Sequence, residues 1–370
     1  MNSVPKVSII LPTYNGQRYI REAIDSIINQ SFSDWELIVI NDCSNDNTFE
    51  ILSDYKEQYC QIHVINNIEN KKLPMSLNIG MREAKGKYVT WTSDDNKYAP
   101  NAISRMVEYL DNHSEYVMVC ADMVAIDEKG NVIDSCISYD EEYMYYNDCV
   151  GACFLYKREV IDAVGEYDVS KFLVEDYDYW LRILSHYGHI GHIKETLYEY
   201  RRHVESLTGQ RENDIRKQLL RERKEYLPQM LDKLKNNRQL ITKMYLEFWE
   251  SDSCPQDVQD GFWEYVPGLK IIKDINPAKK YIIYGAGKFG DMAYKQLGKA
   301  IIKYTDSNKS LYGSYKNNIE IISVTEAMNM ADSVQIIVAA GLGAATDIVL
   351  KLIDSGVKEC AIFPGRKGII

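Results

Sequence analysis

Short apolar runs alternate with segments of helical periodicity over the first hundred residues. The apolar runs are rich in β-branched residues and stop abruptly, which is typical of strands that are buried on both faces. The segments between them repeat apolar residues at the spacing of an amphipathic helix. The predicted strands are residues 6–12, 35–42, 62–67 and 88–91, and the predicted helices are residues 17–30, 45–59 and about 74–85. This alternation predicts an α/β fold in which a mostly parallel sheet lies between helices.

Polar residues stand where several of these strands stop. Tyr14 follows the first strand, Asp42 ends the second, and the adjacent Asp94 and Asp95 follow the fourth. The carboxyl ends of parallel strands meet at one edge of a sheet, and ligands bind there. Adjacent carboxylates repel each other unless a cation lies beside them. The pattern therefore predicts a ligand-binding edge, with a solvated turn as the alternative, because Asp and Asn also favour turns.

The alternation stops near residue 208 and restarts near residue 276. Residues 211–250 are rich in charge and carry leucines at a helical period, with a break or kink expected at Pro228. After "INPAKK" at 275–280, strand and helix patterns alternate again. The predicted parts are an α/β domain at 1–208, a helical linker at 209–275 and a smaller Rossmann-like α/β domain at 276–370.

Composition and charge restrict the class of protein. Of the 370 residues, 45% are hydrophobic and 26% are charged, as in ordinary globular proteins. The formal net charge of −11 argues against a nucleic-acid partner and against polybasic anchoring to anionic lipid. The sequence has neither an apolar run of about 18 residues nor a signal peptide's apolar region. Its eight scattered cysteines suggest free thiols and a cytoplasmic protein, with peripheral association at the inner face of the membrane left open.

Five segments together resemble a known family. They are "VSIILPTYNG" (7–16), "WELIVINDCSNDNT" (35–48), "AKGKYVTWTSDDN" (84–96), "VEDYDYWLR" (174–182) and "YRRHVES" (200–206). In this order they look like an inverting family 2 glycosyltransferase with the GT-A fold, the family of bacterial spore-coat, capsule and lipopolysaccharide sugar transferases. The resemblance covers roughly residues 5–208. It implies transfer of a hexose-type sugar from a nucleotide-sugar donor, with a UDP-sugar expected, to a hydroxyl of a glycan or lipid-linked acceptor in surface polysaccharide synthesis.

The resemblance implies a donor site at the ends of the first two strands. Pro12 and Tyr14 end the first strand, where a tyrosine of family members packs on the nucleotide base. Asp42 would accept a hydrogen bond from the uracil N3–H, although a turn or capping role is the alternative for this residue. Lys72 falls where relatives often carry an arginine near the nucleotide. A lysine supplies the charge without the bidentate fork of an arginine.

The Asp94–Asp95 pair corresponds in the resemblance to a DxD-type motif, in which a carboxylate holds a divalent metal ion on the donor diphosphate. The first acidic position of the usual motif is absent here, so either carboxylate could be the ligand. Hard oxygen ligands suit Mn²⁺ or Mg²⁺. The "YRRHVES" segment resembles a loop that closes over the diphosphate. His203 would reach the metal or a phosphate oxygen, and Arg201 would neutralise charge on the leaving group.

The "VEDYDYWLR" segment supplies the implied catalytic residue. Acidic residues at a helix start can merely complement the helix dipole. Within the family pattern, Asp176 is the general base that takes the proton of the acceptor hydroxyl as its oxygen attacks the anomeric carbon. Glu175 would orient a neighbour rather than transfer a proton.

A second motif lies in the C-terminal segment. Gly285, Gly287 and Gly290 form a G-x-G-x-x-G sequence between a strand and a helix, and Asp306 ends the next strand. This is the context that a dinucleotide fingerprint requires. No substrate domain or catalytic set accompanies it, so we favour a vestigial motif in a structural or homo-oligomerisation module. Two alternative functions stay open: a sugar-nucleotide oxidoreductase or epimerase, and a non-catalytic scaffold of a polysaccharide assembly complex.

Overall fold

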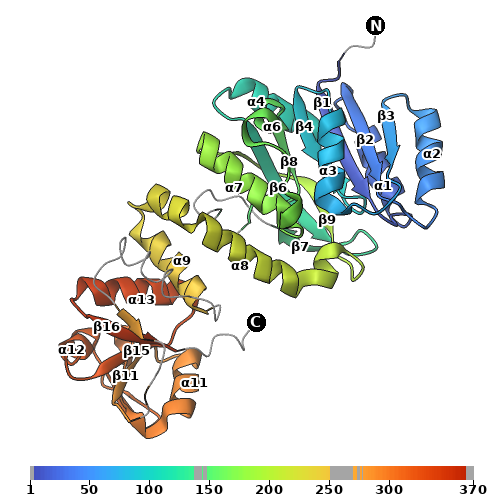
Figure 1. Ribbon diagram of the computed structural model, residues 1–370. Helices are drawn as coiled ribbons and strands as arrows, with labels where there is room; N and C mark the ends of the chain where they lie inside the picture. Colours follow the sequence, from blue (N-terminus) through green and yellow to red (C-terminus); the bar gives the residue numbers. More distant parts are fainter. Residues whose placement is uncertain are drawn as a thin grey trace. The chain divides into compact units, whose positions relative to one another are not determined.

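The computed structural model describes residues 4–136, 144, 148–250, 270–272, 276 and 278–363. The chain forms two compact units, Met1–Tyr226 and Leu227–Ile370. Their division falls inside the segment predicted as a linker, of which residues 251–269 and 273–275 lie outside the described part. Each unit is built around its own sheet (Figure 1).

The described part of the first unit contains nine strands, which are β1 (Val7–Thr13), β2 (Trp35–Asn41), β3 (Ile62–Asn66), β4 (Tyr88–Trp91), β5 (Lys97–Tyr98), β6 (Met118–Ile126), β7 (Val132–Cys136), β8 (Phe154–Lys157) and β9 (Gly191–Arg201). Their order is β3-β2-β1-β4-β8-β6-β9-β5, with β7 paired to β6. Strands β1 to β4 form a parallel group, and β9 is parallel to β6. The predicted α/β fold with a mostly parallel sheet is confirmed.

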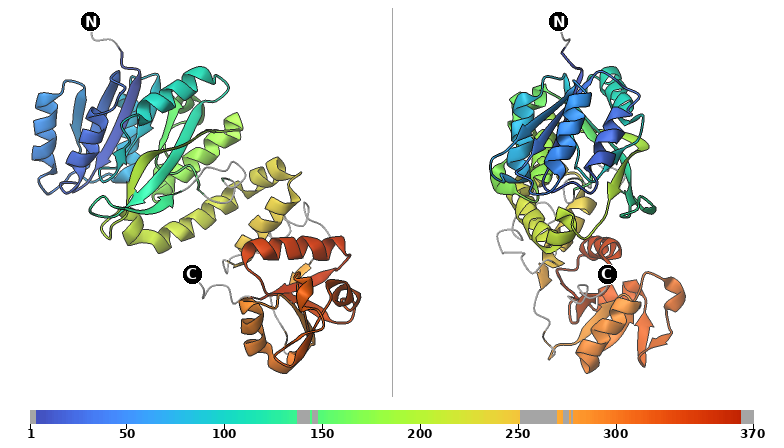
Figure 2. Two further views of the ribbon diagram at one scale, coloured as in Figure 1. Left: turned by 180° about the vertical axis from the view of Figure 1, so that it is seen from behind. Right: turned by 90° about the vertical axis from the view of Figure 1, so that its right-hand side faces the viewer.

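Helices cover both faces of this sheet (Figures 1 and 2). They are α1 (Ile20–Ile28), α2 (Thr48–Gln58), α3 (Lys72–Glu83), α4 (Ala102–Asn112), α6 (Glu159–Val164), the 3₁₀ turn η1 (Val169–Lys171) and α7 (Glu175–Tyr187). Ile9 of β1 shares a buried core with Ile24 of α1 and Ile103 of α4. On the opposite face, Ile10 lies so close to Gly80 of α3 that a Cβ at Gly80 would overlap it. Both faces of the central strands are therefore buried, as their continuous apolar runs predicted.

The helix α8 (Leu207–Leu234) contains the boundary between the two units and is followed by α9 (Arg238–Glu250). The break expected at Pro228 is not present, because the helix continues past that residue. Its non-helical backbone lies at Arg211 instead, with φ −122° and ψ 20°. Proline removes one helical hydrogen bond, and the buried side chains of Leu227 and Leu231 on either side offset that loss through packing.

The second unit contains the strands β10 (Lys270–Ile272), β11 (Tyr281–Tyr284), β12 (Ile301–Thr305), β13 (Tyr315–Lys316), β14 (Ile319–Ile322), β15 (Gln335–Val338) and β16 (Glu359–Ile362). Their order is β10-β16-β15-β11-β12-β14-β13, and every neighbouring pair is parallel except β13 with β14. Its further helices are α11 (Lys288–Leu297), α12 (Val324–Asn329) and α13 (Leu342–Asp354), with 3₁₀ turns η2 (Gly298–Ala300) and η3 (Lys309–Leu311). No helix in the described part of the chain combines the length and the apolar character that crossing a bilayer requires.

Candidate active site

The ends of β1 and β4 bring Thr13 and Asp94 into contact. The two strands are parallel neighbours, and the amide of Thr92 donates to the carbonyl of Ile10 at 2.9 Å. Just beyond them, the Thr13 hydroxyl donates a hydrogen bond to Oδ2 of Asp94. Gly16 lies against this pair, and a Cβ there would overlap both Asp94 and Thr13. The glycine of the "PTYNG" sequence is therefore needed for the close approach of the loop to Asp94.

Asp94 has an unusual affinity for its proton. Burial raises the pKa of its carboxyl to about 7, the neighbouring Asp95 contributes in the same direction, and the hydrogen bond from Thr13 opposes them. A positive charge beside Asp94 would favour its ionised form. Carboxyls perturbed in this way concentrate at functional sites.

Asp95 faces His203, which follows the end of β9. The His203 Nε2 atom lies 2.9 Å from Oδ2 of Asp95, and the imidazole is buried, with 8% of the side chain exposed. The other polar atoms of the pair, Oδ1 of Asp95 and Nδ1 of His203, are buried without a hydrogen-bond partner. Tyr19 packs edge-on against His203 at 5.2 Å between ring centroids. Buried polar atoms of native proteins normally have partners, and the described part of the chain supplies none for these two atoms.

The carboxylates and the imidazole are suitable ligands for a divalent ion. Within the described part of the chain, however, no group of three or more His, Cys, Asp and Glu side chains is arranged to hold a metal by itself.

Arg201 is placed differently from its expected role at the leaving group. Its side chain is 1% exposed, its Nε donates to the carbonyl of Asp95 at 2.9 Å, and its Nη2 pairs with Glu22 at 2.7 Å. The Nη1 atom donates to the carbonyls of Asp127 and Glu128 at 3.1 and 3.2 Å. The guanidinium is thus bound by the protein on all sides, and its position indicates that Arg201 fixes the backbone of Asp95.

Asp42 and Lys72 meet at the beginning of α3. The Asp42 carboxylate accepts the backbone N–H groups of Lys71 and Lys72, each at 2.8 Å, and the Asn67 amide at 2.7 Å. Asp42 therefore binds the backbone at the beginning of α3, which is distant in sequence, rather than the turn that directly follows it. Lys72 has a left-handed backbone with φ 66°, and its ammonium lies 5.3 Å from the centre of the Phe172 ring. This cation–π contact turns the Lys72 side chain toward the segment that precedes α7.

The two residues predicted at the end of β1 differ in exposure. Pro12 is buried within the strand, whereas Tyr14 beyond it is 50% exposed. An exposed aromatic ring at the carboxyl end of a parallel sheet is available to stack on a planar ligand. The contact of Tyr14 with a nucleotide base stays a prediction, and Pro12 is part of the buried strand before it.

Asp176 is the second residue of α7 and follows the buried Glu175, with which the helix begins. Burial raises the pKa of Asp176 above its usual range, and the hydrogen bond from the Tyr177 amide opposes this. Burial, followed by the charge of Asp176, raises the pKa of Glu175 to about 8. The Glu175 Oε2 atom accepts the amide of Leu173 at 2.7 Å, and Leu173 has a left-handed φ of 86°. Glu175 thus fixes the strained residue that leads into the helix of Asp176.

Asp95 and Asp176 act on the same side chain of β9. Burial is the main cause that raises the pKa of the Tyr200 hydroxyl, a hydrogen bond with Thr208 opposes it, and the carboxylates of Asp95 and Asp176 raise it further. Both carboxylates thus contribute to the electrostatic surroundings of Tyr200.

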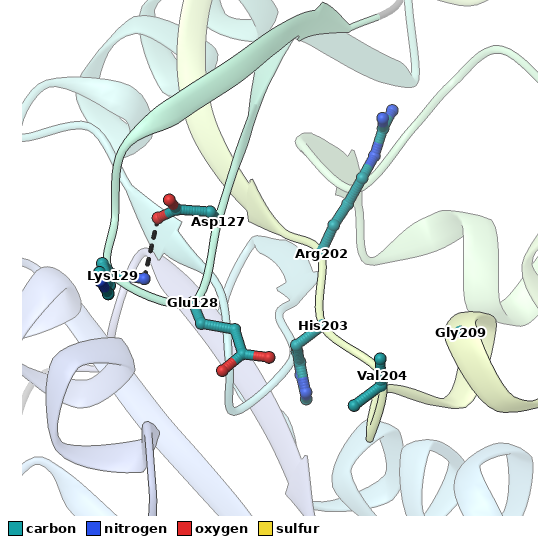
Figure 3. A pocket seen from close by; sticks show the side chains of 7 residues that line it. All are labelled: Asp127, Glu128, Lys129, Arg202, His203, Val204 and Gly209. Atoms are coloured by element: carbon teal, nitrogen blue, oxygen red, sulfur yellow. Dashed lines mark hydrogen bonds between the residues drawn. The ribbon is translucent and has the colours of Figure 1, made fainter.

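A pocket of about 600 Å³ opens beside His203 (Figure 3). It is lined by Asp127, Glu128, Lys129, Arg202, His203, Val204 and Gly209. Figure 3 shows the turn between β6 and β7 on one side and the segment after β9 on the other. Asp127 shapes that turn by accepting the amide of Lys129 at 2.8 Å. His203 thus contacts Asp95 and also borders a space large enough for a substrate group.

The glycine motif of the second unit has packing roles. A Cβ at Gly285 would overlap the carbonyl oxygen of Ala339, and one at Gly290 would overlap that of Gly285, whereas Gly287 has no atom within 4 Å. The Asp306 carboxylate accepts the amides of Ala286 at 2.7 Å and of Asn308 at 2.9 Å. Asp306 therefore satisfies the backbone of the glycine turn itself.

Sequence reasoning missed several residues of the first site. Thr13 and Gly16 lie in the "PTYNG" sequence, so their place next to the strand end was a usable signal. Glu22 and Tyr19 surround Arg201 and His203, with the Arg201 guanidinium 4.4 Å from the Tyr19 ring centre. No local sequence pattern predicts Tyr19 and Glu22 as partners of these residues, because they are distant in the sequence.

Comparison with known proteins gives these residues a family context. The family model described as "Glycosyl transferase family 2" matches residues 8–165. The match contains the segments of Tyr14, Asp42 and Asp94, and it ends before Asp176 and His203. Among solved structures, residues 1–349 of TarS from Staphylococcus aureus, in complex with UDP-GlcNAc, align with a TM-score of 0.51 at 16% identity. That alignment covers 74% of this chain and 95% of the TarS chain, and it supports the fold alone.

Two relatives from Bacillus subtilis match by sequence. EpsE, assigned as a glycosyltransferase, is 32% identical over 207 residues, which are 54% of this chain and 74% of EpsE. TuaG, assigned as a glycosyltransferase of teichuronic acid biosynthesis, is 30% identical over 146 residues, which are 38% of this chain and 58% of TuaG. This chain thus spans between about half and three quarters of the length of these two relatives. By the family model and the extent of the EpsE match, the chain belongs to glycosyl transferase family 2.

Proposed function

We propose that the first unit transfers a sugar from a UDP-sugar to a hydroxyl of a glycan or lipid-linked acceptor, with inversion at the anomeric carbon. The observation that carries this proposal is the pair of carboxylates, Asp94 and Asp95, that follows the carboxyl end of β4. Asp94 accepts a hydrogen bond from Thr13, and Asp95 faces His203 with a buried unsatisfied oxygen. Asp176 on α7 and Asp95 both raise the pKa of the Tyr200 hydroxyl. The donor would lie with its base on Tyr14 and its diphosphate toward Asp94 and Asp95.

A divalent ion, Mn²⁺ or Mg²⁺, fits the acidic edge, and enzymes of this family commonly use one. Asp95 would hold it together with Asp94 or His203, and the diphosphate of the donor would supply the remaining ligands. When bound, such an ion neutralises the charge that develops on the leaving nucleotide. Arg201 supports this arrangement by hydrogen bonding to the Asp95 backbone.

Asp176 would act as the general base. The acceptor oxygen forms a bond to the anomeric carbon while the bond from that carbon to the diphosphate breaks, and the acceptor proton passes to the Asp176 carboxylate. Burial raises the pKa of Asp176, which makes its ionised form a stronger base than an exposed aspartate. Glu175 fixes the backbone that leads into Asp176 through its bond to Leu173.

The acceptor class rests on the relatives. TuaG is named for teichuronic acid biosynthesis, and this supports a surface polysaccharide or its lipid-linked precursor as the acceptor. We further propose that the second unit is a structural or oligomerisation module, since Asp306 already binds the turn that a dinucleotide would occupy.

A product analysis tests the proposed function. The full chain is incubated with Mn²⁺, a panel of UDP-sugars and oligosaccharide or lipid-linked acceptors, and the linkage formed is determined by NMR. We expect UDP release that depends on the acceptor, and a product whose anomeric configuration is opposite to that of the donor. A retained configuration would contradict inversion, and no transfer from any donor of the panel would overturn the proposal.

A further inference from the structure

Tyr167 lies between three elements that carry the residues of the candidate active site. It is 2% exposed and stands between α6 and η1, in a segment to which sequence reasoning gave no role. Its hydroxyl, its ring and its backbone each contact a different element. The hydroxyl contacts the end of β4, the ring contacts α7, and the backbone contacts α3.

The hydroxyl of Tyr167 binds the strand that delivers the metal pair. The indole Nε1 of Trp91 donates to the Tyr167 oxygen at 3.0 Å, and both side chains are buried. Trp91 is the last residue of β4, and the chain continues from it directly to Asp94 and Asp95. A shift of this indole would therefore move the end of β4, and with it the backbone that carries Asp94 and Asp95.

The ring of Tyr167 packs on the helix that carries the proposed base. Its centroid lies 4.4 Å from that of Tyr179, with an angle of 28° between the planes. Tyr179 is fully buried in α7, close behind Asp176. A stacked pair of buried rings fixes the distance between its two backbones more narrowly than flexible aliphatic side chains do.

The backbone of Tyr167 is bound by a buried amide of α3. Asn78 donates to the Tyr167 carbonyl at 2.8 Å and accepts its amide at 2.9 Å, and it is 3% exposed. The same helix begins at the residues whose amides Asp42 accepts. The Tyr167 backbone is thus fixed to the helix that starts at the proposed nucleotide-base site.

We propose that Tyr167 is a positioning residue that sets the metal-binding end of β4 relative to the general base on α7. This inference rests on the proposed function, because it assigns Asp94, Asp95 and Asp176 their roles there. A phenylalanine would fill the same space and keep the stacked ring, so the change removes only the contacts of the hydroxyl, with Trp91 and with Tyr156. Displacement of reacting groups by about 1 Å can cost a hundredfold in rate, and a lost hydrogen bond between buried anchors produces a smaller shift.

The test compares two single-atom changes in the full chain. Tyr167→Phe removes the hydroxyl beside the end of β4, and Tyr88→Phe removes a hydroxyl at the beginning of the same strand, where it donates to Asp111 at 2.6 Å. We expect Tyr167→Phe to lower kcat about tenfold with the donor KM changed less than about twofold. Tyr88→Phe should leave both constants unchanged, although the two variants should lose similar thermal stability. An unchanged kcat in Tyr167→Phe, or an equal loss in Tyr88→Phe, would overturn the inference.

Trp91→Phe removes the other partner of the same hydrogen bond and provides a second route if Tyr167→Phe does not fold. Trp91→Phe should lower kcat with the same preserved KM, and the double variant should be no slower than the slower single variant. Additive losses would show that the two side chains act separately and would contradict the inference. If the wild-type chain transfers sugar and both Tyr167→Phe and Trp91→Phe have the same kcat as wild type, the proposed function stands and only this inference fails. If the wild-type chain transfers no sugar, both fail.

Discussion

The two units each place an aspartate at the carboxyl end of a parallel strand, but they use it differently. In the first unit, Asp95 has a buried oxygen without a partner, and burial raises the pKa of Asp94 to about 7. In the second unit, both oxygens of Asp306 accept amides of the neighbouring backbone. The comparison teaches that a strand-end motif becomes a candidate site when its polar atoms are left unsatisfied by the protein. By this criterion the first unit carries the candidate site, whereas Asp306 in the second unit only satisfies a turn.

We expect the largest effect from an Asp→Asn substitution, which can be made at a matched position in each unit. Asp176→Asn should lower kcat about 10²- to 10⁴-fold, because the acceptor hydroxyl loses its proton acceptor, while UDP affinity changes only a few-fold. Asp306→Asn, the same change in the second unit, should leave transfer unaffected. The measurement is steady-state transfer with both variants. Activity of Asp176→Asn above about a tenth of wild type would exclude Asp176 as the base.

Glycine-to-alanine substitutions in the two units test how tightly each glycine loop is packed. Gly16→Ala places a methyl group against Asp94 and Thr13, whereas Gly287→Ala places one in open space. We expect Gly16→Ala to lower the free energy of unfolding by about 1–3 kcal/mol, as overpacking does, and to weaken Mn²⁺-dependent UDP binding. Gly287→Ala should change stability by less than about 0.5 kcal/mol. Chemical denaturation measures both, and a neutral Gly16→Ala would contradict the close approach described for Asp94.

Glu175 should give the first unit a characteristic pH dependence. Its pKa in the folded chain, about 8, lies above the ordinary value of 4.5, so folding favours the neutral carboxyl. This contribution to stability is fully present below about pH 4.5 and is lost as the pH rises through about 8. Between pH 7 and 9 the loss is on the order of 1 kcal/mol. Denaturation of wild type and Glu175→Gln across this range measures it, and parallel curves for the two proteins would refute the raised pKa.

The smallest effect is expected from adding a dinucleotide, to which the second unit should not respond. NAD and NADP at millimolar concentration should leave the melting temperature of the full chain unchanged, since Asp306 binds the glycine turn from within. A dinucleotide present at a hundred times its Kd would add about 2.7 kcal/mol, which a thermal shift would detect. A clear shift that disappears in Asp306→Asn would make the glycine turn a working site.

The alternation of strands and helices was enough to predict the first sheet and to place Asp42, Asp94 and Asp95 at one edge, because apolar period and strand polarity are local properties. The surroundings of Arg201, whose guanidinium pairs with Glu22, could not be predicted, because that contact depends on the packing of distant elements. The contact of Lys72 with Phe172 also joins distant segments. Side-chain roles that depend on tertiary contacts therefore needed the structure.

The most direct test of the account is calorimetric titration of the full chain with UDP, in Mn²⁺ and again after chelation of the metal. The account predicts that one UDP binds per chain in the presence of Mn²⁺ and that affinity falls at least about tenfold when the metal is removed or when Asp95 is changed to Ala. Asp95→Ala should bind UDP equally with and without metal. UDP binding that is indifferent to both Mn²⁺ and Asp95 would contradict the assignment of the metal and donor site to this edge of the first sheet.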